Sequence, residues 1–233
     1  MLYSKTELLR TMSCNPWFAA LPLGERKALL AQADAEPVVL HAGEMLFRKG
    51  DAGCGFYGLL SGRLKVSTVG EDGREGILSV VEAGNWLGET ALLDGLARPH
   101  DVTALQPCEL LAISPAAFAR LMRRSAFARG MAGLLSARVR ALYGLVEDAM
   151  LCSTRTRVAR RLLALARGDA TLAPQARVRL TVSQEALAMM LGLTRQTLSK
   201  ELKALVQAGV LTLGYGRIEI VSLAALEQRG ALA

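Results

Sequence analysis

Cysteine and histidine are scarce in this sequence. Among 233 residues there are 4 Cys and 2 His. The cysteines are Cys14, Cys54, Cys108 and Cys152, which lie far apart and form no CxxC or Cys/His ligand spacing. This arrangement argues against a zinc or iron–sulfur site. It favours ordinary buried thiols, with a redox sensor as the alternative, and we predict no metal ligand.

Long hydrophobic runs are also missing. No uninterrupted apolar stretch approaches the roughly 18 residues of a membrane span. The stretch most similar to a signal-peptide core, residues 17–23, is short and broken by Pro22. With 52% apolar and 21% charged residues, the composition is typical of a soluble folded protein, and the length favours two modest domains. We expect a cytoplasmic protein without membrane contacts.

The first two thirds of the chain have no excess of positive charge, and the excess lies in the last third. Up to Thr154 there are 16 Lys and Arg against 16 Asp and Glu, whereas from Arg155 there are 12 against 5. The net charge of +7 therefore belongs to the C-terminal part. This favours a surface for a polyanion there, with a merely solvated basic face as the alternative.

Glycine punctuates short apolar runs after Pro37. Turn signals recur roughly every 8 to 12 residues, the spacing of an antiparallel sandwich or roll. They lie at Ala42-Gly43, Lys49-Gly50-Asp51, Ser61-Gly62, Glu71-Asp72-Gly73 and Ala83-Gly84-Asn85. We therefore predict a β-domain.

A helical period replaces this pattern from Pro115 to about Cys152. Apolar residues at alternating steps of three and four predict one narrow seam that pairs with a second chain. Arg138 is a polar interruption that could set the register, and the alternative is that the seam packs only on its own β-domain. The predicted dimer-interface residues are Met131, Leu135, Arg138, Leu142, Leu145 and Ala149.

The segment LTVSQEALAMMLGLTRQTLSKELKALVQAGVL, residues 180–211, predicts a helix-turn-helix. Thr181 followed by Gln184 has the spacing of a capping box, Gly192 permits a tight turn, and Thr194 can cap the second helix. In that helix Leu198, Leu202 and Leu205 are expected to face inward. The run GVLTLGYGRIEIVSL then predicts a hairpin, so that the whole region is expected to be a winged helix.

The outer face of the second helix carries side chains suited to DNA bases. Arg195 can pair with guanine and Gln196 with adenine, while Ser199 or Lys200 can reach a base or a phosphate. An ordinary polar surface is the alternative. The predicted DNA-binding residues are Thr181, Ser183, Thr194, Arg195, Gln196, Thr197, Ser199, Lys200 and Arg217.

These motifs together resemble the Crp/Fnr family of bacterial transcription regulators. The resemblance runs from about Asn15 to Ser222 and implies an α+β protein with an N-terminal cyclic-nucleotide-binding β-roll (jelly roll), a long dimerisation helix and a C-terminal winged helix-turn-helix. We assign these parts to residues 1–125, 126–153 and 154–233. The resemblance implies a homodimer that binds double-stranded DNA and RNA polymerase, and in which an effector changes the packing of the seam.

By the same resemblance, WLGETALLDGLAR matches the family's phosphate-binding cassette. Gly88 and Glu89 would meet the ribose, and Arg98 would pair with a cyclic phosphate. The next position is usually serine or threonine in nucleotide binders, but Pro99 here has neither a hydroxyl nor an N–H. Further expected effector contacts are Thr90 and His100, as substitute donors, and Tyr143, which could stack on a base.

Several interpretations of this cassette stay open. The effector could be cyclic AMP, another nucleotide such as a cyclic dinucleotide, or no nucleotide at all. Glu89 and Arg98 could instead pair with each other or with Asp101 and hold an empty roll together. The protein could also be a nucleotide-binding module acting on a non-DNA partner.

An enzyme is not predicted. Residues 53–58 spell GxGxxG, but a dinucleotide site needs a strand before this motif and a helix after it. The following residues, LLSGRLKVSTV, contain a turn and β-branched residues instead. No nucleophile elbow or catalytic carboxylate pair is present, so we name no catalytic residue.

Overall fold

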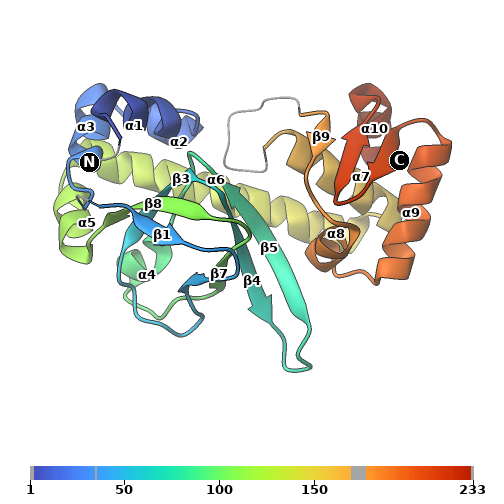
Figure 1. Cartoon of the computed structure of the whole chain (residues 1–233), viewed down its shortest axis with the longest axis horizontal. Coiled ribbons are helices and arrows are strands. Elements are labelled where there is room, and N and C mark those ends of the chain that lie inside the picture. Colours follow the sequence, from blue (N-terminus) through green and yellow to red (C-terminus); the bar gives the residue numbers. More distant parts are fainter. Residues whose placement is uncertain (1–2, 35, 169–176, 232–233) are drawn as a thin grey trace. The chain divides into compact units, whose positions relative to one another are not determined.

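The computed structural model describes residues 3–34, 36–168 and 177–231. The chain divides into two compact units (Figure 1). The first contains two clusters of buried apolar residues and the second contains one. The first contains the residues up to Arg74 together with Leu78–Ser136, and the second contains Glu75–Ile77 together with the residues from Ala137 onward.

Two four-stranded sheets form the centre of the first unit. Their strands are β1 (Val38–Leu40), β2 (Met45–Phe47), β3 (Phe56–Ser61), β4 (Arg63–Val69), β5 (Glu75–Glu82), β6 (Trp86–Leu87), β7 (Asp101–Ala104) and β8 (Cys108–Ile113). One sheet has the order β1-β8-β3-β6 and the other β2-β7-β4-β5. Leu59 and Leu110 from the first sheet share a buried core with Leu64 and Val102 from the second. The predicted β-roll is therefore present.

Strand β3 contributes to two cores because successive side chains of a strand point to opposite faces. Tyr57 and Leu59 lie in the core between the two sheets, whereas Phe56 and Leu60 lie in a second core on the other face. The sheet containing β3 is thus covered on both faces. This explains why the strand is continuously apolar instead of alternating with polar residues.

Helices cover the outer face of that sheet. They are α1 (Lys5–Met12), α2 (Pro16–Ala20), α3 (Leu23–Leu30), α5 (Pro115–Met122) and the first part of α6 (Ser125–Leu151). The aromatic rings of Phe56 and Trp86 stack there with centroids 5.0 Å apart. The indole N–H of Trp17 donates to the carbonyl of Gly130 over 2.7 Å, which ties the N-terminal helices to α6.

The predicted glycine turns are confirmed. Gly43, Gly50, Gly62, Gly73 and Gly84 all have positive φ. The requirement is strictest at Gly62, because a Cβ there would lie 2.4 Å from the carbonyl oxygen of Pro107. Any side chain at this position would clash with the backbone of the neighbouring loop.

Helix α6 differs from the predicted seam in its first part. Met131 is 1% exposed and packs in the core of the first unit with Phe127 and Leu134. Its assignment to the dimer interface is therefore wrong, because the N-terminal turns of α6 are used to cover the β-roll. Beyond Ser136 no residue of the helix is fully buried, and its exposed large apolar residues are Val139, Leu142, Tyr143, Leu145, Val146, Met150 and Leu151.

The second unit combines helices with a small sheet. Its helices are α7 (Thr154–Ala166), α8 (Gln184–Leu191), α9 (Arg195–Gln207) and α10 (Leu223–Gly230), and its strands are β9 (Arg179–Leu180), β10 (Leu211–Gly214) and β11 (Arg217–Ile220). The strand order is β10-β11-β9. The predicted hairpin is β10-β11, which pairs Leu211 with Ile220. Buried residues of all these helices and strands form one core.

No helix in residues 3–34, 36–168 and 177–231 is long and apolar enough to cross a membrane. Within the same described ranges, no three His, Cys, Asp or Glu side chains gather into a group that could hold a metal ion.

Candidate functional site

Arg98 is the centre of the cassette predicted in the β-roll. Its side chain is 2% exposed. One terminal N–H donates to the carbonyl of Gly88 over 2.6 Å, and the other donates to the carbonyl of Gly55 over 2.8 Å. The guanidinium also lies over the ring of Phe47, 4.2 Å from its centroid. Backbone carbonyls and an aromatic ring thus hold this cation inside the roll.

Gly88 is the residue that lets Arg98 approach the backbone. It connects β6 to α4 (Glu89–Asp94) and adopts φ +95°. A Cβ at this position would lie 2.7 Å from the carbonyl oxygen of Gly55 and 2.9 Å from Nη1 of Arg98. Only glycine combines this conformation with this contact.

Glu89 and Thr90 begin the short helix that follows. Glu89 is 2% exposed, which is unusual for a carboxylate. The hydroxyl of Thr90 lies 3.3 Å from Oε1 of Glu89, to which it donates. The structure therefore brings Gly88, Glu89 and Arg98 together, while Thr90 is engaged with the glutamate.

The two residues after Arg98 differ in their surroundings. Pro99 is exposed, whereas His100 is half-buried and its Nδ1 is among the buried side-chain atoms without a hydrogen-bond partner in the described structure. Burial lowers the pKa of His100, the charge of Lys49 lowers it further, and Asp101 opposes both. The imidazole is therefore biased toward its neutral form.

The alternative pairing of Arg98 with Asp101 is not what holds the arginine. The carboxylate of Asp101 instead accepts from the backbone N–H of Lys49 over 2.8 Å. The backbone of Arg98 is itself fixed, since its N–H donates to the carbonyl of Asp51 and its carbonyl accepts from Gly50. Tyr143 lies on α6 and is 65% exposed, and its contact with an effector stays a prediction.

Sequence reasoning missed the residues on the opposite wall of the cassette. The carbonyl of Gly55 accepts a hydrogen bond from Arg98, whose Cζ lies 6.0 Å from the centroid of the Tyr57 ring. The hydroxyl of Tyr57 lies 3.3 Å from Sγ of Cys54. These residues belong to the GxGxxG stretch, which the structure shows is no dinucleotide motif because its last three residues begin strand β3 and no helix opens from it. The only available signal was this dense run of glycines, which we attributed to turns.

The helix-turn-helix is formed by α8 and α9. Gly192 ends α8 with φ +63°. The side chain of Thr194 accepts from the backbone N–H of Thr197 and caps α9, as predicted. Leu198 and Leu202 are each fully buried, so the inward face of α9 is also confirmed.

The predicted cap of α8 was misplaced. Ser183, not Thr181, is the N-cap, and its hydroxyl accepts from the backbone N–H of Ala186 over 3.0 Å. Thr181 instead directly follows strand β9, which pairs with β11 and so postpones the start of the helix by two residues. Both Thr181 and Ser183 are exposed.

Polar side chains line the outer face of α9. Arg195, Gln196 and Lys200 are exposed, and Ser199 is half-buried beside them. Thr197 is exposed too, with its hydroxyl 2.9 Å from that of Thr194. The first turn of α9 therefore presents the donors and acceptors that base edges recognise.

The tip of the β10-β11 hairpin is a second exposed surface of this unit. Gly214 pairs with Arg217, and a Cβ on Gly214 would lie 2.6 Å from Nε of Arg217. The arginine side chain thus lies across the hairpin backbone. Tyr215, which we did not predict as a site residue, is fully exposed at the turn.

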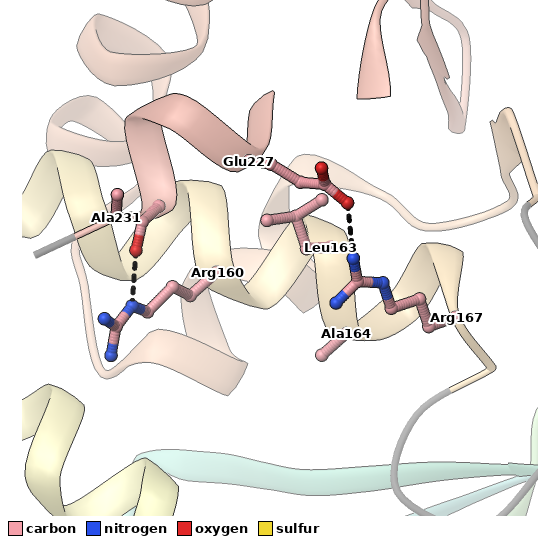
Figure 2. A pocket seen from close by; sticks show the side chains of 7 residues that line it. Arg160, Leu163, Ala164, Arg167, Glu227 and Ala231 are labelled. Atoms are coloured by element: carbon pink, nitrogen blue, oxygen red, sulfur yellow. Dashed lines mark hydrogen bonds and ion pairs between the residues drawn. The ribbon is translucent and has the colours of Figure 1, made fainter. Parts of the chain in front are cut away.

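A separate hollow of about 380 Å³ lies between α7 and α10 (Figure 2). Two of its lining residues are arginines, but both have partners. Arg160 donates to the carbonyl of Gly230 over 2.7 Å and pairs with Asp148, and Arg167 pairs with Glu227. Because acidic groups already neutralise these arginines, the hollow is a poor anion site.

Comparison with known proteins identifies both units. A family model for the cyclic nucleotide-binding domain matches residues 37–125, and one for the Crp-like helix-turn-helix domain matches residues 156–229. The chain is 33% identical over 187 residues to the cyclic AMP receptor protein of Thermus thermophilus. The aligned region covers 80% of this chain and 84% of that protein. It is 26% identical over 180 residues to the CRP-like cAMP-activated global transcriptional regulator of Mycobacterium tuberculosis. Here the aligned region covers 76% of this chain and 80% of the relative.

A solved structure agrees with these matches. The catabolite activator protein of Thermus thermophilus aligns with a TM-score of 0.53 and 29% identity, over 92% of this chain and 98% of that one. The relative from Mycobacterium tuberculosis is named a global transcriptional regulator. The α+β fold class, with a β-roll and a C-terminal helix-turn-helix, is confirmed. The chain therefore belongs to the Crp/Fnr family and is a DNA-binding transcription regulator.

Proposed function

We propose that the β-roll of this regulator binds a cyclic nucleotide, with the cyclic phosphate at Arg98 and the ribose at Gly88 and Glu89. The observation that carries this proposal is the state of Arg98. Its two hydrogen bonds go to neutral carbonyls, and its Nε is a buried donor without a partner in the described structure. A phosphate would supply both the missing acceptor and the compensating charge.

Cyclic AMP is the first candidate because relatives that are similar over 80% and 76% of this chain are described as cyclic AMP receptor or cAMP-activated proteins. A regulator without a nucleotide is the second candidate. Pro99 favours it, since proline has no N–H to offer a phosphate, and the terminal donors of Arg98 are already satisfied.

A thermal shift separates these candidates. We expect about 1 mM cyclic AMP to raise the melting temperature, because a ligand at 100 times its Kd adds about 2.7 kcal/mol. Cyclic GMP and cyclic di-GMP are the comparison ligands. The shift should vanish in Arg98→Ala, since a lost charge-assisted hydrogen bond costs about 1.5–3 kcal/mol.

Each variant is compared with its own melting temperature without ligand, because removing a buried arginine also changes stability. Arg74→Ala is the matched control, since this arginine is 88% exposed in the β4–β5 turn and should leave the shift intact. If none of the three nucleotides shifts the native protein, the second candidate is correct.

We further propose that the protein is a cytoplasmic homodimer paired through α6. The apolar residues Leu135, Leu142, Leu145 and Ala149 lie beyond the buried start of this helix, with Arg138 among them. Residues 1–125 would act as the sensor, 126–153 as the dimerisation helix and 154–233 as the DNA-binding domain, which would meet RNA polymerase at the promoter. The effector would act by shifting the packing of the paired helices.

In this proposal the first turn of α9 enters the major groove, and Arg195, Gln196, Ser199 and Lys200 read base edges. Thr194 and Thr197, together with Thr181, Ser183 and Arg217, would contact the phosphates on either side. The exposed wing residue Arg217 suits this role because it is cationic and held across the hairpin.

We expect Arg195→Ala to weaken binding to the preferred duplex by about 1–3 kcal/mol per half-site and to relax the preference at one base pair. The preferred duplex is the one that the native protein selects from a random library, and binding is measured by fluorescence anisotropy at fixed salt. The matched control is Lys203→Ala, an exposed cation further along α9. It should weaken preferred and random duplexes equally. Unchanged base preference in Arg195→Ala would mean that another residue reads the groove.

A further inference from the structure

Cys54 lies beside the groups that hold Arg98. This cysteine is exposed in the loop before β3. Its Sγ lies 3.3 Å from the hydroxyl of Tyr57, and the next residue, Gly55, accepts a hydrogen bond from the Arg98 guanidinium. The thiol, the phenol and the guanidinium thus form one cluster on the wall of the cassette.

We propose that Cys54 is a peroxide-reactive thiol, and that its oxidation blocks anion binding at Arg98. The reactivity of Cys54 is inferred from the cluster alone. The second half rests on the proposed function, because it concerns the same arginine.

The electrostatics of the cluster favour a reactive thiolate. The hydrogen bond with Tyr57 lowers the pKa of the Cys54 thiol, and the Arg98 guanidinium lowers it further against the opposing effect of partial burial. Burial, and then the interaction with Cys54, raises the pKa of Tyr57 above its usual range. The phenol therefore stays protonated and can donate to the thiolate. Low thiol pKa and exposure together are the conditions for reaction with peroxides.

The other exposed cysteine lacks these neighbours. Cys14 is also exposed, but its Sγ lies 3.8 Å from the carbonyl of Arg10, an acceptor that cannot stabilise a thiolate. It is therefore a natural internal control for exposure alone.

The oxidation step needs only a hydroperoxide such as hydrogen peroxide. The thiolate sulfur attacks one peroxide oxygen, an S–O bond forms and the O–O bond breaks. Sulfur loses two electrons, the peroxide gains them, and the departing hydroxide takes a proton from solvent to become water. The product is a sulfenic acid, which excess thiol reduces again.

The product changes what Arg98 can bind. The new oxygen on Cys54 would be an acceptor one residue from the Gly55 carbonyl that holds the guanidinium, and the buried Nε of that guanidinium has no partner in the described structure. It would compete with a nucleotide phosphate for that arginine and occupy space at the cassette wall. Oxidation would therefore act as an off-switch for the effector site.

The reactivity is tested without any nucleotide. The native protein is treated with hydrogen peroxide, sulfenic acid is trapped with dimedone, and each cysteine is followed by peptide mass spectrometry. We expect Cys54 to be trapped at least about tenfold faster than Cys14, and Tyr57→Phe to slow Cys54 by about tenfold through loss of the hydrogen bond. Equal rates at the two cysteines, or no effect of Tyr57→Phe, would overturn the proposal.

The switch is tested with the cyclic AMP thermal shift. Peroxide should abolish the shift in the native protein and in Cys14→Ser, and dithiothreitol should restore it. In Cys54→Ser the shift measured before peroxide should equal the shift measured after it. A shift that survives full oxidation of Cys54 contradicts the off-switch. If the untreated protein shows no shift, the proposed function has failed, the off-switch falls with it, and the trapping rates still decide the reactivity of Cys54.

Discussion

Replacing Leu142 and Val146 together with glutamate is expected to convert the protein into a monomer and to lower its affinity for a two-half-site duplex about 100-fold or more. These side chains are 60% and 52% exposed on α6. A row of exposed apolar side chains is unfavourable in water and typically marks an interface with a partner. Four glutamates at a paired interface would be buried and repel one another. A monomer binds one half-site only, and therefore loses the affinity that a dimer gains by binding both half-sites of the duplex at once.

Light scattering gives the mass in solution, and anisotropy gives the affinity for the selected duplex. The matched control is Val69→Glu with Leu78→Glu, which adds the same charge at apolar residues of β4 and β5 that are 50% and 41% exposed. The control protein should remain a dimer. Dimeric mass in the α6 variant would place the interface elsewhere.

Gly88→Ala is expected to destabilise the β-roll by about 2–5 kcal/mol and to abolish the nucleotide-dependent thermal shift. Two costs add at this position: alanine at φ +95° is strained, and its Cβ would lie 2.7 Å from a backbone oxygen that cannot move aside. The clash would also displace Gly55 and Arg98, and the carbonyls of Gly55 and Gly88 both accept hydrogen bonds from that arginine. Chemical denaturation measures the change in the free energy of unfolding.

Gly73→Ala separates the two costs. Gly73 has φ +76°, but a Cβ there meets nothing within 4 Å. Its substitution should therefore cost only the backbone strain of about 1–2 kcal/mol and should preserve the shift. Equal destabilisation by both substitutions would mean that the roll relaxes around the new methyl group and that the close approach at Gly88 is unimportant.

The parts that were predictable from the sequence are governed by local interactions. The turns at Gly43, Gly50 and Gly62 follow from the backbone freedom of glycine. Helix α9 follows from a cap at Thr194 and leucines at helical spacing. Such signals depend on only a few neighbouring residues, and therefore predict the local structure without knowledge of the rest of the chain.

The errors arose where a distant element intervened. Thr181 has capping-box spacing with Gln184, yet the pairing of β9 with β11 leaves Ser183 to cap the helix. Met131 continues an apolar seam, yet the β-roll covers it. In both cases the local pattern was compatible with two structures, and contacts with residues far along the chain selected one.

The sequence by itself determined a β-domain, the long helix and the helix-turn-helix, because periodicity, turn residues and motif spacing are written in consecutive positions. The cassette residues Gly88, Glu89 and Arg98 were indicated by the resemblance to the Crp/Fnr family. Only the tertiary structure decided what surrounds Arg98. It brings the carbonyl of Gly55, more than 40 positions away, to the guanidinium, and it places the thiol of the adjacent Cys54 beside Tyr57. Which residues meet across a roll depends on strand pairing and sheet packing, and no local pattern specifies those.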